Sequence, residues 1–277
     1  MRALVQGILI TRPHNVAIAA VAVTAGALTG SATILHPSQI FWAAVAAALI
    51  TAGGNTLNDV ADLAVDAVNK PNRPLPSGRL DPKAALVLAI VLFAAGLAAT
   101  LPLPPACRLI AAASVGLIVF YDLWASGSTL IGNLVVSLLT GTAFLFGSLA
   151  AGTGAWGLIP GVFAFFFDLG REVVKDLEDC EADRTGGLTT LPITAGEGVA
   201  RRTAIAALLI LLALLPVPSL AGWLAFPYLP IVLAGVGIPV AIVIAGLRRP
   251  REAAVYRRFQ IIMKVDMIVG LLAILSG

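Results

Sequence analysis

Charged residues are scarce in this chain of 277 residues. They make up 12% of it, whereas soluble domains carry about 25%. Apolar residues make up 59%, and no soluble core of this size needs so much apolar surface. The composition therefore excludes an ordinary soluble domain and predicts a membrane protein. The apolar runs are too long and too continuous for barrel strands, which favours membrane-spanning helices.

Cysteine and histidine are also rare, with two residues of each. Cys107 and Cys180 form no disulfide framework or metal-binding motif, and both are expected to be free thiols. His14 and His36 have no partner at a spacing that suits metal ligation. The short apolar run between Arg2 and Arg12 lacks a signal-peptide cleavage site, so the first apolar helix is expected to remain as an anchor.

Apolar runs, in contrast, are abundant, and turn-forming stretches such as LPLPP at 101–105 separate them. The predicted fold is all-α: a polytopic membrane protein whose single integral-membrane domain covers 1–277, with about nine transmembrane helices. The nine predicted spans are 14–35, 38–58, 83–101, 105–124, 129–151, 155–175, 199–220, 225–247 and 258–276.

The basic residues indicate an orientation for these spans. If the N-terminus is cytoplasmic, 17 of the 18 Lys and Arg residues lie in inner loops or at inner helix ends, and only Arg108 lies outside. The positive-inside rule therefore supports a multi-pass protein of the cell membrane with a cytoplasmic N-terminus. The formal net charge of +3 is explained by this orientation, and nothing in the sequence indicates nucleic-acid binding.

The few acidic residues are unevenly distributed, because six of the 15 gather in two clusters. The clusters are Asp59, Asp62 and Asp66, and Asp176, Asp179 and Asp183. Both have spacings of three and then four residues, which place the side chains on one helix face, and they lie 117 residues apart. This pattern predicts two diverged repeats, roughly 1–125 and 126–277, with an acidic helix face at the inner end of each.

Neighbouring carboxylates repel one another, and charge at membrane depth is expensive, so a cation should compensate them. A hard divalent cation suits oxygen ligands, and Mg²⁺ completes its coordination with water and phosphate oxygens. The clusters therefore predict a magnesium site that holds a diphosphate. Lys175, Arg171, Arg73 and Arg12 could neutralise the remaining phosphate charge. An apolar bundle beside such a site suits a prenyl diphosphate and a lipid-like acceptor.

Two longer motifs surround the clusters. The first is NDVADLAVD at 58–66 followed by NRPLPSG at 72–78, and the second is REVVKDLEDCEAD at 171–183 followed by GGLTTLP at 186–192. They resemble the two signatures of the UbiA-type intramembrane prenyltransferases, and the nine-span layout is similar, so the resemblance covers essentially the whole chain. It implies helices around a central cavity open to lipid, with both motifs facing each other at the cytoplasmic end. It also implies loss of diphosphate, an allylic carbocation and capture by an acceptor, in a cavity that excludes water.

The residues of both motifs receive specific roles from this reasoning. The predicted catalytic metal ligands are Asp62, Asp66, Asp179 and Asp183, with Asn58 and Asp59 as further ligands. The predicted diphosphate-binding residues are Asn58, Arg73, Lys175 and Arg171. The candidate acceptor or cavity residues are Asn15, Arg12, Tyr121 and Asp176. Arg171 could instead pair with Glu172 or neighbouring acids, and each carboxylate taken singly could be a solvated helix end.

Within the family, the run at 170–183 and the opening RPHN at 12–15 are most similar to archaeal members that make ether lipids. The resemblance implies transfer of a geranylgeranyl group from geranylgeranyl diphosphate to the hydroxyl of geranylgeranylglyceryl phosphate. One departure is notable. Relatives often carry a lysine shortly after the tyrosine that ends the fourth span, whereas Tyr121 is followed by DLWASGS. If that lysine binds anions in relatives, another group does so here.

Other functions stay open at this point. An aromatic acceptor, as in quinone or chlorophyll pathways, would need the same prenyl diphosphate chemistry. A CDP-alcohol phosphotransferase would show one compact run of four aspartates with a DG and an AR pair, and the chain lacks both pairs there. A cation-coupled transporter would place acids near mid-membrane on broken helices, whereas these acids lie at predicted inner ends.

Overall fold

The computed structural model of the protein describes residues 2–30, 36–125 and 128–276. Regular structure within these residues is entirely helical, which confirms the predicted all-α class. In the described part of the chain, six helices are long and apolar enough to cross a membrane. They are Pro37–Ala61, Pro105–Ala125, Ile131–Ala151, Glu197–Leu220, Tyr228–Leu247 and Ala253–Ser276. Two more apolar helices, Pro13–Leu28 and Pro82–Ala98, are shorter.

Each of the nine predicted spans contains helix in the described residues, although positions 31–35 of the first span lie outside them. The sixth predicted span, 155–175, is the one whose predicted end differs most from the end of the observed helix. The helix there, α8 (Leu158–Thr185), continues through the whole second motif. It ends where Gly187 adopts a φ of 74°, with Leu188 N–H bonded to the Asp183 carbonyl at 2.9 Å, as glycine-terminated helices do. The count of nine spans and the cytoplasmic N-terminus remain predictions.

The chain divides into two compact units, which are described separately. The N-terminal unit comprises Met1–Ser126 and Thr142–Gly157, and the C-terminal unit comprises Gly127–Gly141 and Leu158–Gly277. The helix α7 (Ile131–Ala151) therefore contributes one part to each unit. The predicted repeats, roughly 1–125 and 126–277, remain a prediction about ancestry that this division does not test.

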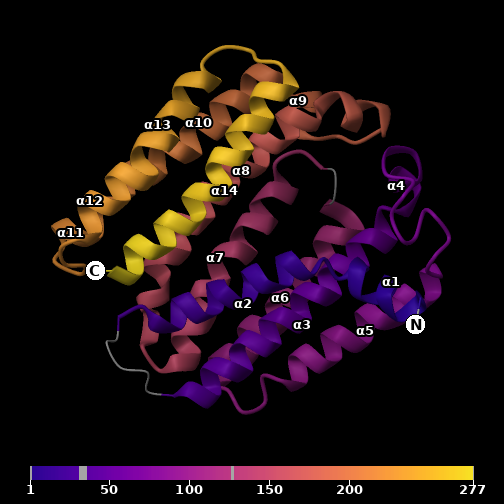
Figure 1. The fold of residues 1–277 in the computed structure, drawn as a ribbon, viewed down its shortest axis with the longest axis horizontal. Coiled ribbons are helices and arrows are strands. Elements are labelled where there is room, and N and C mark those ends of the chain that lie inside the picture. Colours follow the sequence, from indigo (N-terminus) through magenta and orange to yellow (C-terminus); the bar gives the residue numbers. More distant parts are fainter. Residues whose placement is uncertain (1, 31–35, 126–127, 277) are drawn as a thin grey trace. The chain divides into compact units, whose positions relative to one another are not determined.

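The N-terminal unit is built around α3. Its helices are α1 (Arg2–Ile10), α2 (Pro13–Leu28), α3 (Pro37–Ala61), α4 (Leu63–Asn69), α5 (Pro82–Ala98), α6 (Pro105–Phe120), the π-helical turn η1 (Tyr121–Ala125), part of α7 and the 3-10 turn η2 (Gly154–Gly157). α3 packs against α2, α5 and α6, and α5 runs beside it over much of its length (Figure 1). Small residues permit this close approach, as is common between membrane helices. A Cβ on Gly53 would lie 2.8 Å from the Phe93 ring, and one on Gly96 would lie 2.7 Å from Ile50 Cγ1.

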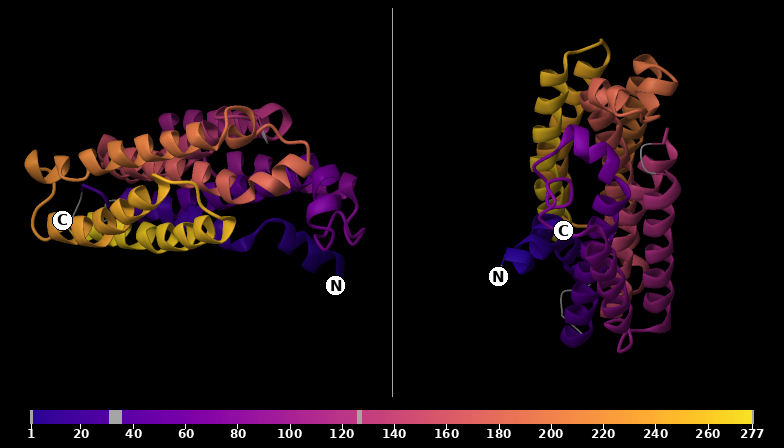
Figure 2. Two further views of the ribbon diagram at one scale, coloured as in Figure 1. Left: turned by 90° about the horizontal axis from the view of Figure 1, so that it is seen from above. Right: turned by 90° about the vertical axis from the view of Figure 1, so that its right-hand side faces the viewer.

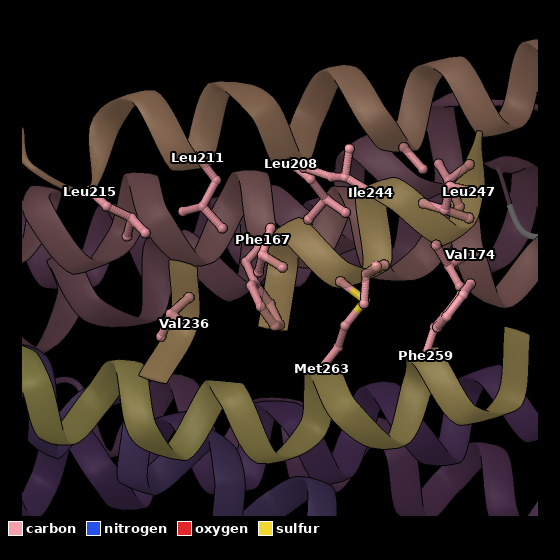
Figure 3. Close-up of a cluster of buried hydrophobic side chains, with 14 of the residues drawn as sticks. Phe167, Val174, Leu208, Leu211, Leu215, Val236, Ile244, Leu247, Phe259 and Met263 are labelled. Carbon is pink, nitrogen blue, oxygen red and sulfur yellow. The ribbon is translucent and has the colours of Figure 1, made fainter. Parts of the chain in front are cut away.

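The C-terminal unit surrounds α8. Its other helices are α9 (Leu191–Thr194), α10 (Glu197–Leu214), α11 (Val217–Leu220), α12 (Tyr228–Val232), the π-helical turn η3 (Leu233–Gly237), α13 (Ile238–Leu247) and α14 (Ala253–Ser276). α8 packs against both α10 and α14, and α13 and α14 form an antiparallel pair (Figures 1 and 2). Figure 3 shows the resulting core, in which Phe167 of α8 meets Leu211 of α10 and Met263 of α14. This core fixes α14 beside the part of α8 that carries the second motif.

The small residues between α3 and α5 generate the first prediction. Gly96→Ala should lower the stability of the protein, because the added methyl must displace Ile50 Cγ1, and overpacking of this kind costs about 1–3 kcal/mol. Gly116→Ala in α6 is the matched control, since a Cβ there meets nothing within 4 Å. The control should be neutral or stabilising, because alanine favours helix. Thermal unfolding of both purified variants in the same detergent tests this; equal Tm values would contradict the packing argument.

Candidate active site

The first motif lies across a break between two helices. α3 ends at Ala61, Asp62 stands at the junction, and α4 begins at Leu63. Helical hydrogen bonding continues through the break: Asp62 N–H bonds the Asn58 carbonyl at 2.9 Å, and Asp66 N–H bonds the Asp62 carbonyl at 2.8 Å. Asn58, Asp62 and Asp66 are four residues apart, which predicts a ladder along one helix face, and the hydrogen bonds show that ladder. Within it, Asn58 Nδ2 donates to Asp62 Oδ2 at 3.1 Å.

Arg12 brings positive charge to this motif from the turn before α2. Its Nη2 group pairs with Asp59 and donates to Asn58 Oδ1 at 3.0 Å. Asn55 secures the same turn by donating to the Thr11 carbonyl at 2.8 Å. Arg12 has a φ of 51°, and a residue other than glycine adopts this left-handed conformation only at a steric cost. The backbone strain is therefore located where the side chain reaches the acidic motif.

Arg73 approaches the same carboxylates from the loop after α4. Its Nη1 group lies 3.3 Å from Asp59 Oδ1 and also pairs with Asp66. Lys70 Nζ lies 3.7 Å from Asp66. Asp59 and Asp66 are buried, so these cations compensate charges that would be costly to leave alone in an apolar environment. The predicted diphosphate ligand Arg73 is thus held beside the first aspartate motif.

Asp122 is a member of this site that sequence reasoning did not find. It lies in η1, where α6 changes to π-helical geometry, and such π-bulges are frequent at functional sites. Asn58 Nδ2 donates to Asp122 Oδ1 at 3.2 Å. The other oxygen, Oδ2, is buried and has no hydrogen-bond partner among the described residues. The signal in the sequence was an acid inside an apolar span. The neighbouring residue of η1, Tyr121, is half-buried.

Asn15, a candidate acceptor residue, lies in the first turn of α2. Its amide nitrogen is 3.5 Å from Asn55 Oδ1, a long hydrogen bond. Asn55 in turn holds the turn that carries Arg12. Asn15 is therefore close to the support of the first motif, and its role remains a prediction.

The second motif forms its own charge network on α8. Arg171 lies 2.8 Å from Asp168 Oδ1 and also pairs with Glu172, so the alternative considered for Arg171, an acid pair, is what the structure shows. Thr140 donates to the other oxygen of Asp168 at 2.9 Å. Lys175 Nζ lies 3.6 Å from Glu172 Oε2. Asp168 and Glu172 are buried, so α8 carries two buried acids that neutralise its two predicted phosphate ligands.

The three aspartates of the second motif differ in their surroundings. Asp176 is buried and accepts a hydrogen bond of 2.8 Å from Asn133 of α7. Asp179 and Asp183 are half-buried further along α8. Because Asp176 is engaged by a neutral amide inside the unit, it is suited to position α8, whereas Asp179 and Asp183 are more accessible to ligands.

A polar cavity of about 430 Å³ opens beside the second motif. α8 contributes Arg171, Lys175, Glu178 and Asp179 to its lining, and α14 contributes Arg257, Gln260, Ile261 and Lys264. The cavity therefore contains three residues that the sequence assigned to metal or phosphate binding. The sequence uses Arg257 and Lys264 only as evidence of membrane orientation. The four α14 residues are three or four positions apart, which places them on one helix face.

The residues of both motifs can be compared with known proteins. The sequence profile of the UbiA prenyltransferase family matches residues 19–268. The chain belongs to the UbiA prenyltransferase family. It is therefore a membrane protein of the prenyltransferase class, as its sequence predicted.

Individual relatives give a narrower comparison. A digeranylgeranylglyceryl phosphate synthase from Methanopyrus kandleri is 39% identical over 268 residues, covering 97% of both chains. A solved structure described as digeranylgeranylglyceryl phosphate synthase in membranes has a TM-score of 0.84 and 26% identity, covering 100% of this chain and 99% of that one. A UbiA homologue from Archaeoglobus fulgidus, solved with GPP and Mg²⁺, has a TM-score of 0.73 and 18% identity, covering 97% of this chain and 99% of that chain. The last similarity shows the fold alone.

The donor groups of this UbiA family member fit a magnesium ion. Within the described residues no group of three or more His, Cys, Asp and Glu side chains is gathered as a ready metal cluster. Mg²⁺ does not need one, because it commonly uses one or two carboxylates together with water and phosphate oxygens. Beside the first motif, Asn58 donates hydrogen bonds to both Asp62 and Asp122. The second carboxylate oxygen of Asp122, Oδ2, has no hydrogen-bond partner among the described residues. Such oxygen donors suit a hard cation.

Arg12 generates the second prediction. Arg12→Ala and Arg12→Gly should both lose most prenyl-transfer activity, because each removes the cation that contacts Asp59 and Asn58. The two variants should differ in stability. Glycine relieves the left-handed backbone, so the glycine variant should be more stable than the alanine variant by about 1 kcal/mol. Thermal unfolding and a transfer assay on both proteins provide the measurements. Full activity in the glycine variant would show that only the backbone turn matters.

Proposed function

We propose that the protein transfers a geranylgeranyl group from geranylgeranyl diphosphate to the hydroxyl of geranylgeranylglyceryl phosphate, a step in archaeal ether-lipid synthesis. The observation that carries this proposal is the 39% identity, over 97% of both chains, to a relative named digeranylgeranylglyceryl phosphate synthase. The membership in the UbiA family supplies the reaction class, and the relative supplies the acceptor.

The two aspartate motifs are assigned to one reaction because each supplies part of what the chemistry needs. Asp62, Asp66, Asp179 and Asp183 are proposed as ligands of Mg²⁺, with Asn58 and Asp59 beside them. Arg73, Lys175, Arg171 and Asn58 are proposed to bind the diphosphate. The carboxylates of Asp62 and Asp122, which Asn58 draws together, support the metal assignment, as do the Mg²⁺ and GPP bound to the Archaeoglobus fulgidus homologue.

The proposed reaction breaks the bond between C1 of the prenyl chain and the diphosphate oxygen. The electron pair leaves with the diphosphate, and C1 becomes part of an allylic carbocation. The acceptor hydroxyl oxygen then donates a lone pair to C1 and forms the ether bond. Its proton passes to a carboxylate of the site or to the released diphosphate. Bound Mg²⁺ would withdraw charge from the leaving group, and the cationic side chains of Arg73 and Lys175 stabilise the same developing negative charge.

The apolar bundle has two tasks in this proposal. It holds the prenyl chains, and it excludes water that would otherwise capture the carbocation. We place the site at the cytoplasmic face, because 17 of the 18 basic residues lie on that side if the N-terminus is inside. Soluble diphosphates and Mg²⁺ reach a membrane enzyme from that face.

The acceptor assignment is tested by offering two acceptors in parallel. Purified protein with Mg²⁺ and labelled geranylgeranyl diphosphate should convert geranylgeranylglyceryl phosphate to a labelled diether product. An aromatic acid acceptor should yield no labelled product. The reverse outcome would favour an aromatic-acceptor prenyltransferase, and no transfer to either would remove the proposed reaction.

The site assignment is tested by Asp62→Ala and Asp179→Ala. Each should reduce Mg²⁺-dependent transfer by about 100-fold or more, since removal of a group that stabilises a leaving-group charge commonly has this effect. Glu181→Ala is the matched control on α8. Glu181 is exposed and its side chain lies 3.9 Å from Arg184, a surface ion pair whose loss should change activity little. Normal activity in both aspartate variants would overturn the metal site.

A further inference from the structure

The cavity beside the second motif contains two cations besides those assigned to the diphosphate. Four cations line it, two from α8 and two from α14, together with the acids Glu178 and Asp179. The α8 cations Arg171 and Lys175 are paired with Asp168 and Glu172, so the positive charge that remains for a further anion comes from Arg257 and Lys264 of α14. A phosphomonoester carries about −1.5 to −2 at neutral pH. Two cations on one wall of the cavity can pair with the oxygens of one such group.

The α14 wall is held in place by direct bonds to α8. Gln260 Nε2 donates to the Arg171 carbonyl at 2.7 Å, and Gln260 is buried. Arg257 Nε donates to Glu178 at 2.9 Å. An arginine side chain has five N–H donors, and this bond uses only the one on Nε. Glu178 therefore orients the guanidinium of Arg257, whose two terminal nitrogens can donate to an anion. These bonds hold the two helices that form the walls of the cavity in fixed positions.

The chemistry of the proposed acceptor requires a second phosphate near this place. In geranylgeranylglyceryl phosphate, the reacting hydroxyl and the phosphate belong to one glycerol unit, so they are separated by only a few bonds. The hydroxyl must reach C1 of the donor, which is bonded to the diphosphate. The acceptor phosphate must therefore bind next to the residues that hold the diphosphate. Arg171 and Lys175 are those proposed residues in this unit, and Arg257 and Lys264 line the same cavity.

An apolar surface continues from the cavity along α14. Ile261 lines the cavity and is exposed. It begins a stripe of exposed apolar side chains spaced alternately by four and three residues: Ile261, Val265, Ile268, Leu272 and Leu275. The stripe follows one helix face for about 21 Å. An amphiphile with its head group in the cavity therefore has a continuous apolar surface for its chain.

We infer that the cavity between α8 and α14 binds the phosphomonoester of the lipid acceptor, and that Arg257 and Lys264 select an acceptor that carries it. This inference rests on the proposed function. It also supplies an anion-binding group for a chain that has no lysine in the DLWASGS segment after Tyr121. Arg171 and Lys175 serve the donor side of the cavity, whereas the α14 cations serve the acceptor side.

The test compares Arg257→Gln and Lys264→Gln with the wild type in membranes of uncharged lipid, so that phospholipid head groups do not compete. The KM for geranylgeranylglyceryl phosphate should rise about tenfold in each variant, since a hydrogen bond to a charged group is lost. The KM for geranylgeranyl diphosphate should stay within about twofold. With geranylgeranylglycerol, which lacks the phosphate, wild type and variants should react equally.

Two further variants separate binding from folding. Arg258→Gln removes a neighbouring exposed cation of α14 that does not line the cavity, and it should leave both KM values unchanged. Arg257→Lys keeps the charge and should restore part of the acceptor affinity. Equal losses with the phosphate-free acceptor, or a raised KM for the donor alone, would overturn the assignment. If the enzyme is active and both glutamine variants keep the wild-type KM for the acceptor, the acceptor-site inference is wrong and the proposed function stands. If the wild type does not transfer to geranylgeranylglyceryl phosphate, both the inference and the proposed function are wrong.

Discussion

The compensation of buried carboxylates by arginine is the interaction on which the rest of the site depends. Asp59 is buried in an apolar unit, and it is paired with Arg12 from one side and Arg73 from the other. An unpaired charge in such surroundings would be strongly destabilising. The two arginines come from segments that precede and follow α3, so the ion pairs also fix the turn before α2 and the loop after α4. Arg12 has its left-handed backbone in a turn that these ion pairs and the Asn55 hydrogen bond hold in place.

The second motif solves the same problem by a different route. Its cations are on the same helix as its acids, at spacings of one, three and three residues: Arg171 with Glu172, Arg171 with Asp168, and Lys175 with Glu172. These three pairs are complete within α8, and the helix remains continuous from Leu158 to Thr185. Because local pairs need no loop to complete them, α8 can present Lys175 and Asp179 to a cavity whose other wall is α14.

The spacing of residues along the chain predicts contacts within one helix, but it does not predict contacts between helices. Composition and apolar runs predicted the all-α membrane class, and helical spacing predicted the ladder from Asn58 to Asp66. Spacing cannot report which distant helix will lie against a given face. Asp122 is 64 residues from Asn58 in the chain, and Asn133 is 43 residues from Asp176, so both contacts depend on tertiary packing. The α14 cations were assigned to orientation alone for the same reason, because only the packing of α14 on α8 places them at a cavity.

The difference between the two motifs at one equivalent position also has a physical reason. Asn58 occupies the ladder position that Lys175 occupies in the second motif. Its oxygen accepts from Arg12, while its nitrogen donates to Asp62 and Asp122. A lysine has donors only, so at position 58 it could not accept the hydrogen bond from Arg12 and would place a second cation beside that guanidinium. The neutral amide is the group that can join an arginine to two carboxylates, and it leaves those carboxylates with the negative charge that the proposed Mg²⁺ site needs. In the second motif Lys175 lies 3.6 Å from Glu172 Oε2, and its ammonium group brings positive charge to the proposed phosphate site.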